Sequence, residues 1–121
     1  MTKKVLVLGA HDDDPFIGVG GILLSRHMQH KIFIQVFTNG QNSHVVVLGE
    51  HESPTPKQVA RARYEELCNA VHVIECTSSD ADVTLDQWQY PDTCGVLTEQ
   101  IIEVEKLLLD LMTSFAPDVV Y

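Results

Sequence analysis

The sequence is poor in positive charge and has no long apolar run. It carries 8 Lys and Arg residues against 17 Asp and Glu residues, which gives a formal net charge of −9. A chain this acidic repels nucleic-acid backbones and anionic membranes, so neither is expected as a partner. The first apolar run, residues 5–10, is too short for a signal-peptide core or a membrane span. We therefore expect a cytoplasmic protein without a membrane span.

Cysteine is also scarce. Cys68, Cys76 and Cys94 are odd in number and form no C-x-x-C pair, which excludes a disulfide framework and a zinc ribbon. The chain has 121 residues, 45% of them hydrophobic, and can bury a core without such cross-links. We expect one domain over residues 1–121, in a reducing compartment.

Apolar periodicity predicts strands that alternate with helices. The predicted strands cover residues 5–9, 32–38, 71–76 and 118–121, and the predicted helices cover residues 16–30, 55–70 and 97–115. Between the third strand and the last helix, residues 77–95 are read as an acidic loop that contains Trp88 and Tyr90. This alternation indicates an α/β fold, a doubly wound three-layer α/β/α domain with a mostly parallel sheet.

The loop that follows the first strand, residues 9–15, has the sequence G-A-H-D-D-D-P. In open α/β sheets ligands bind beyond the carboxyl ends of the strands, so this loop is the expected site. A dinucleotide site is excluded, because Leu23 stands where the third glycine would be. The imidazole of His11 and the carboxylate of Asp14 suit zinc and leave Asp13 free to act on a water. Alternatively, Asp14 caps the following helix and its acidic neighbours are solvated.

Several motifs carry a family resemblance. Residues 10–21 resemble the A-H-P-D-D-E-x-x-G-x-G-G signature of the LmbE-like, PIG-L family of zinc-dependent N-deacetylases. Residues 38–41 resemble the family's T-x-G-E, residues 63–67 its R-x-x-E-L and residues 117–121 its P-D-x-V strand. The resemblance implies a Rossmann-like fold that removes the acetyl group from an N-acetylglucosamine-type substrate. It also implies that His11 and Asp14 bind Zn²⁺ and that Asp13 is the general base.

The match has gaps. Asp12 replaces the family's proline and Pro15 its glutamate. The family's third zinc ligand is a histidine in an H-P-D-H motif beyond the strand that ends here at Tyr121, and this chain has no such motif. His44 or His51 could supply the ligand, or both are exposed loop histidines. We therefore interpret the chain as the N-terminal part of a longer fold, and expect these 121 residues alone to bind zinc weakly and to show little activity.

Arg63 is the candidate substrate-binding residue. Its guanidinium could hold a substrate phosphate or hydroxyl, positioned by Glu66 one helical turn away. The alternative is an exposed ion pair on the helix. Trp88 and Tyr90 could stack on a sugar ring, or they cover the core.

The sequence thus predicts a metal-dependent amide hydrolase that acts on a small sugar-like molecule. A non-catalytic metal-binding or ligand-binding relic of the same fold is one rival hypothesis. Another is a phosphoacceptor receiver domain, which also has an acidic cluster after its first strand. A receiver needs an aspartate at the end of the third strand, however, and the predicted strand ends at Cys76. Whether the chain forms a homo-oligomer is left open.

Overall fold

The computed structural model describes residues 2–25, 30–43, 54–77 and 82–121. These residues form four strands and four helices. In chain order they are β1 (Lys3–Gly9), α1 (Asp14–Leu23), β2 (His30–Thr38), α2 (Pro56–Thr77), β3 (Asp82–Tyr90), α3 (Val96–Glu99), α4 (Ile101–Phe115) and β4 (Val119–Val120).

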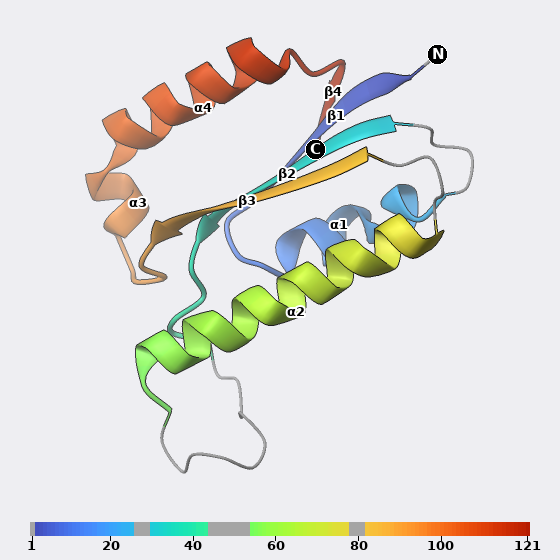
Figure 1. The fold of residues 1–121 in the computed structure, drawn as a ribbon. Coiled ribbons are helices and arrows are strands. Elements are labelled where there is room, and N and C mark those ends of the chain that lie inside the picture. Colours follow the sequence, from blue (N-terminus) through green and yellow to red (C-terminus); the bar gives the residue numbers. More distant parts are fainter. Residues whose placement is uncertain (1, 26–29, 44–53, 78–81) are drawn as a thin grey trace.

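The four strands make one parallel sheet in the order β3-β2-β1-β4. Helices α1 and α2 cover one face of this sheet and α4 lies over the other face, which confirms the three-layer α/β/α fold (Figure 1). The chain adds β2 and β3 on one side of β1, then crosses over and adds β4 on the other side. The point of reversal therefore lies at the carboxyl end of β1, where ligand sites form in this class of fold.

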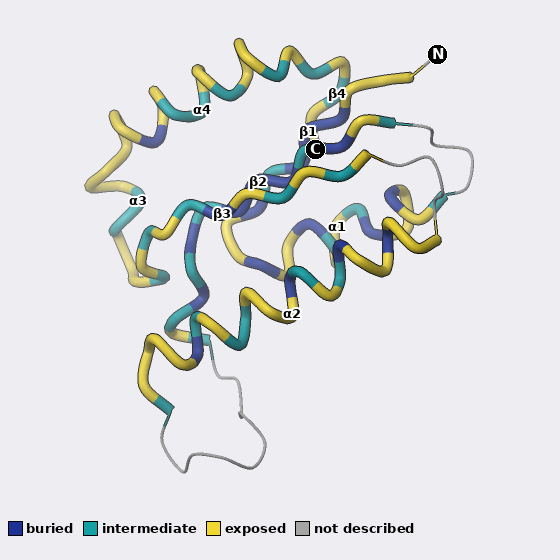
Figure 2. The backbone as a smooth tube through the Cα atoms, viewed as in Figure 1, coloured by how far each residue is buried: buried dark blue, intermediate teal, exposed yellow. Residues whose placement is uncertain are grey.

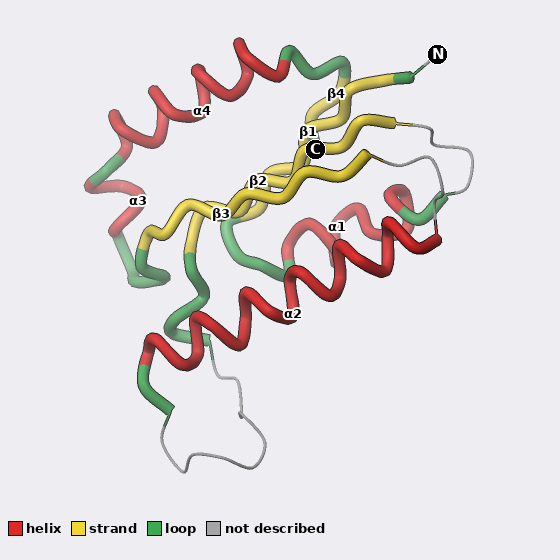
Figure 3. Tube along the Cα trace, in the orientation of Figure 1, coloured by secondary structure: helices red, strands yellow, loops and turns green. Residues whose placement is uncertain are grey.

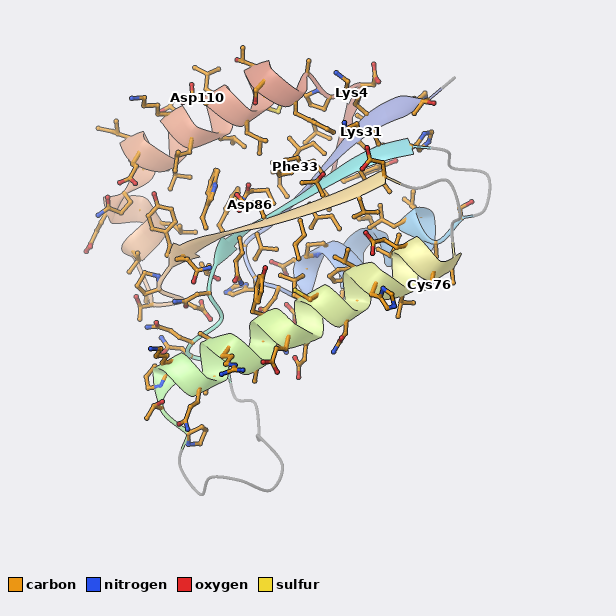
Figure 4. The ribbon with its side chains drawn as sticks, viewed as in Figure 1. Lys4, Lys31, Phe33, Cys76, Asp86 and Asp110 are labelled. Atoms are coloured by element: carbon orange, nitrogen blue, oxygen red, sulfur yellow. The ribbon has the colours of Figure 1, made fainter. Side chains whose placement is uncertain are left out.

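The core lies mainly between the sheet and the pair α1 and α2. Strand β1 is buried on both faces, with Val5, Leu6 and Val7 at most 1% exposed, as a central parallel strand should be. Helix α4 is mostly exposed, and only Val104 is buried in it (Figure 2). On that side Phe33 of β2 points toward α4 (Figure 4), and its ring lies 5.4 Å from that of Phe115.

The prediction was wrong for the middle of the chain. Residues 71–76, predicted as a strand, continue α2, and the third strand lies in residues 82–90, predicted as a loop (Figure 3). Val71 and Ile74 are buried with Leu67 at four-residue and three-residue intervals, so a helical spacing continues through the β-branched stretch. In β3 the exposure alternates along the strand, a pattern of period two.

Other boundaries differ by smaller amounts. Helix α1 ends at Leu23, whereas the predicted helix ran to His30, which belongs to β2. The last predicted helix is divided at Gln100 into α3 and α4. Within the described part of the chain, none of the helices combines the length and the apolarity that crossing a membrane requires.

Candidate functional site

The turn from β1 into α1 is closely packed. A Cβ atom on Gly9 would lie 2.8 Å from Cδ of Pro15, so a larger residue there would displace the turn. Asp13 occupies the N-cap position of α1, and its carbonyl accepts the backbone N–H groups of Phe16 and Ile17. This packing projects the side chains of residues 11–14 from the carboxyl edge of the sheet.

The first group at this edge contains His11, Asp14 and Asp92. Nδ1 of His11 lies 3.5 Å from Oδ2 of Asp14, and Nε2 lies 2.9 Å from Oδ1 of Asp92. The same Asp14 oxygen accepts the backbone N–H of His11 at 2.8 Å. Asp14 does not cap the helix with its side chain, because α1 has no side-chain cap hydrogen bond.

Asp92 was not predicted from the sequence. It follows β3 directly, with only Pro91 between, so it stands at the same carboxyl edge as the loop after β1. Asn42 donates a hydrogen bond from Nδ2 to the Asp92 carbonyl and holds this segment near the end of β2. The rule that located His11 would also have located Asp92, had residues 82–90 been recognised as a strand.

The second group surrounds Arg63 of α2. Nε of Arg63 lies 2.9 Å from Oδ2 of Asp12, and Nη1 lies 2.7 Å from Oε2 of Glu66. Nη2 lies 3.8 Å from Oδ2 of Asp13. The Arg63 side chain is 17% exposed and that of Asp12 is 5% exposed. Both predicted arrangements placed Glu66 beside Arg63, as the structure does, but the arginine is mostly buried rather than part of an exposed ion pair.

The end of β2 closes over this second group. Thr38 donates its hydroxyl and its backbone N–H to the carbonyl of Ala10. Gly40 then has a φ of +65°, and a Cβ atom there would lie 3.1 Å from both carboxylate oxygens of Asp12. The same atom would lie 3.3 Å from Cβ of Arg63. A glycine is required here both by the left-handed backbone and by the close approach.

The charges at this edge raise the pKa values of two side chains, His11 and Arg63. Partial burial of His11 lowers the pKa of its imidazole, but the hydrogen bond and charge of Asp92 and the charges of Asp14 and Asp13 outweigh it. The pKa therefore lies above the ordinary 6.5. Burial likewise acts against the charged form of Arg63, and the charges of Asp12, Glu66 and Asp13 raise its pKa nevertheless. Arg63 therefore stays a cation at every physiological pH.

A cavity of about 170 Å³ lies against the second group. Asp12, Asp13, Arg63 and Glu66 provide its charged side. Its apolar side is formed by Phe16, Ile17, Leu67 and Ala70, from α1 and α2. Asp13 therefore lines the cavity, and its charge also acts on His11.

The donor atoms of His11 and Asp14 have the separation of two zinc ligands. Two ligands of a tetrahedral zinc ion lie about 3.3 Å apart, given metal–ligand bonds of about 2.0 Å. The 3.5 Å between Nδ1 of His11 and Oδ2 of Asp14 fits this separation. Asp92 faces the other ring nitrogen, and the described residues contain no group of three side chains that could hold a metal. The residues fit two positions of a metal site.

His44 and His51 lie outside the described residues. Trp88 stacks on Phe37 with a centroid distance of 4.9 Å and an interplanar angle of 10°, which makes it a packing residue of β3 rather than part of a loop. Cys76 is exposed near the end of α2.

The chain matches the model of a known protein family. The family model described as GlcNAc-PI de-N-acetylase (PIG-L) matches residues 6–121. The search of curated proteins found no match.

Two solved structures share the fold. N,N'-diacetylchitobiose deacetylase from Pyrococcus horikoshii, complexed with an inhibitor, has a TM-score of 0.76 at 25% identity. The match covers 98% of this chain and 39% of that one. GalB, the 4-carboxy-2-hydroxymuconate hydratase from Pseudomonas putida KT2440, has a TM-score of 0.70 at 20% identity, and the match covers 98% of this chain and 45% of GalB. The chain thus spans less than half the length of either neighbour.

Proposed function

Since the chain belongs to the PIG-L family of GlcNAc-PI de-N-acetylases, we propose that it is a metal-dependent amide hydrolase that removes the acetyl group from an N-acetylglucosamine-type substrate. One observation carries the proposal. His11, Asp13 and Asp14 project together from the carboxyl edge of β1, and the donor atoms of His11 and Asp14 are 3.5 Å apart. The deacetylase among the structural neighbours supports the same reaction class.

His11 and Asp14 would hold the metal, which we propose to be zinc. When bound, zinc polarises the amide carbonyl and makes a neighbouring water more acidic. Asp92 prepares His11 for this role. An ionised carboxylate can only accept, so the short contact requires that Nε2 of His11 carries the proton. Nδ1, which faces Asp14, then keeps its lone pair for the metal.

Asp13 would be the general base. Its side chain is 53% exposed and lines the cavity, so a water and an amide can both reach it. It takes the proton from the attacking water as the tetrahedral intermediate forms. The same carboxyl group then returns the proton to the departing amine. The amide C–N bond breaks, and acetate and a free amine are released.

Arg63 would bind the substrate. Its guanidinium borders the cavity beside Asp13, so a hydroxyl of the sugar could accept from it while the acetamide faces Asp13. The apolar side of the cavity, including Phe16 and Leu67, would pack against the face of the sugar ring. These contacts position the amide for attack.

The proposal is tested by two measurements on one preparation. Equilibrium dialysis measures zinc binding, and acetate release from N,N'-diacetylchitobiose measures hydrolysis under single-turnover conditions. We expect bound zinc together with slow acetate release that the Asp13→Asn variant abolishes. Acetate release that persists in Asp13→Asn would contradict the proposed base.

A second function, metal binding without hydrolysis, is favoured by one observation. The described residues supply two donors where catalytic zinc sites use three. Zinc binding with no acetate release from any acetamido sugar would support this alternative and contradict the hydrolase.

A further inference from the structure

We propose that Asp12 is a positioning residue that orients Arg63 and makes the adjoining cavity select uncharged acetamido sugars over phosphorylated ones. The selectivity rests on the proposed function, because it concerns the substrate that Arg63 receives. Asp12 stands where the family motif has proline, a residue that offers no charge to an arginine.

Asp12 and Arg63 form a buried ion pair, although their two closest atoms do not meet in hydrogen-bond geometry. The Asp12 side chain is 5% exposed, and its Oδ2 lies 2.9 Å from Nε of Arg63. Gly40 approaches both carboxylate oxygens so closely that a methyl group there would lie 3.1 Å from each. The carboxylate thus lies between the end of β2 and α2, largely closed off from solvent, and the guanidinium of Arg63 is its partner there.

The three nitrogens of Arg63 face three different carboxylates. Nε faces Asp12, Nη1 faces Glu66 at 2.7 Å and Nη2 faces Asp13 at 3.8 Å. The contacts with Asp12 and Glu66 are short ion pairs, whereas the contact with Asp13 is long. A ligand oxygen could therefore take the place of Asp13 at Nη2 and leave both short ion pairs intact. Asp12 and Glu66 therefore leave the Nη2 side of the guanidinium, which is turned toward the proposed base, as the part that can bind substrate.

The same arrangement decides which substrate is accepted. One guanidinium faces three carboxylates at the wall of the cavity, so the acidic charge exceeds the basic charge there. A phosphate group would meet net repulsion, whereas a neutral hydroxyl needs only a hydrogen-bond donor. Of the two ligand groups that an arginine at this position could hold, the cavity favours the hydroxyl.

The first test uses the unmodified protein. NMR spectroscopy resolves the Nε–H protons of arginine, and Arg61 on the same helix provides a matched control because its side chain is 82% exposed in its pair with Glu65. Nε of each arginine lies close to a carboxylate oxygen, at 2.9 Å in Arg63 and 3.0 Å in Arg61, so the two differ mainly in burial. The Nε–H of Arg63 is expected to exchange with solvent about tenfold more slowly than that of Arg61, because the Arg63 side chain is 17% exposed and its carboxylate partner is buried. Equal exchange rates would overturn the role of Asp12.

The second test measures binding to the metal-free protein by NMR titration with N-acetylglucosamine and N-acetylglucosamine 6-phosphate. The unmodified protein should prefer the neutral sugar. The isosteric Asp12→Asn variant should shift the ratio of the two dissociation constants about tenfold toward the phosphate. Glu65→Gln, which removes an equal charge from α2 outside the cavity, should leave the ratio unchanged.

An unchanged ratio in Asp12→Asn would overturn the proposal, and so would the failure of both sugars to bind the unmodified protein. The outcome is separable from that of the proposed function. A protein that releases acetate but shows no shift in the ratio contradicts the role of Asp12 alone. A protein that shows the shift but releases no acetate contradicts the hydrolase alone.

Discussion

The two charged groups at the carboxyl edge differ in their access to solvent. Side chains of His11, Asp13 and Asp14 are 48%, 53% and 46% exposed. Asp12 and Arg63, from the same loop and the facing helix, are 5% and 17% exposed. The exposed group can bind an ion or a reactant, whereas the buried group joins the β1–α1 loop to α2. Substitutions in the exposed group should therefore affect activity with little change in stability, whereas substitutions in the buried group should lower stability as well as alter substrate binding.

The largest effect is expected for Asp13→Asn. This change keeps the shape of the side chain but removes the group that accepts the proton, a contribution typically of about 10² to 10⁴ in rate. The rate of acetate release should fall accordingly, while the free energy of unfolding stays the same because the side chain is exposed. A variant that retains the rate but unfolds more easily would reverse the proposed division between the two groups.

Arg63→Met should, unlike Asp13→Asn, lower stability as well as weaken substrate binding. It leaves the buried Asp12 carboxylate without its cation, and we expect the free energy of unfolding to fall by about 2–3 kcal/mol. Arg61→Met removes an exposed ion pair and should cost less than about 0.5 kcal/mol. Urea denaturation measures both. Equal losses in the two variants would show that burial of the Arg63 pair adds nothing.

Gly40→Ala should lower stability by a smaller amount. The residue has a φ of +65° and a Cβ atom would press on Asp12, so about 1–2 kcal/mol is expected. Gly21→Ala provides the control, because nothing lies within 4 Å of its Cβ position. It lies inside α1, where alanine should stabilise by about 0.5–1 kcal/mol. Thermal unfolding midpoints that move in the same direction for both variants would contradict this account.

The smallest expected effect concerns the protonation of His11 in the metal-free protein. Its pKa is raised above 6.5 mainly through Asp92, so the protonated form stabilises the fold below that pH. This contribution is lost as the pH rises through the folded pKa. Asp92→Asn should lower the pKa of His11 and weaken the dependence of stability on pH in this window. An NMR titration of the imidazole that is unchanged in Asp92→Asn would contradict the assignment.

The sequence predicts those parts of the fold where periodicity and burial agree. The continuous apolar run of β1 and the regular spacing of α4 identified a strand and a helix. Residues 71–76 were wrongly predicted as a strand because they contain β-branched residues, which favour strands locally. In the structure Val71 and Ile74 pack in the core with Leu67 at a helical spacing, which favours the helix. Tertiary packing decided between them.

The same error concealed part of the site. His11, Asp13 and Asp14 adjoin in the sequence, so a single motif brings them together. Asp92 contacts His11 because β3 pairs with β2 and ends at the same edge of the sheet. Since the third strand was predicted in the wrong place, Asp92 could not be assigned to the site. The contact between Asp12 and Arg63 spans the loop and α2, and depends on the approach of Gly40. No local pattern in the sequence encodes that approach.

The central claim is the division of roles within the exposed group, with His11 and Asp14 as ligands and Asp13 as the base. Zinc dissociation constants of the unmodified protein, Asp13→Asn and Asp14→Asn, measured by isothermal titration calorimetry at one pH, test it without requiring turnover. We predict that Asp13→Asn binds zinc as the unmodified protein does and that Asp14→Asn binds it more weakly. Loss of zinc binding in Asp13→Asn, with binding retained in Asp14→Asn, would exchange the two roles and contradict the account.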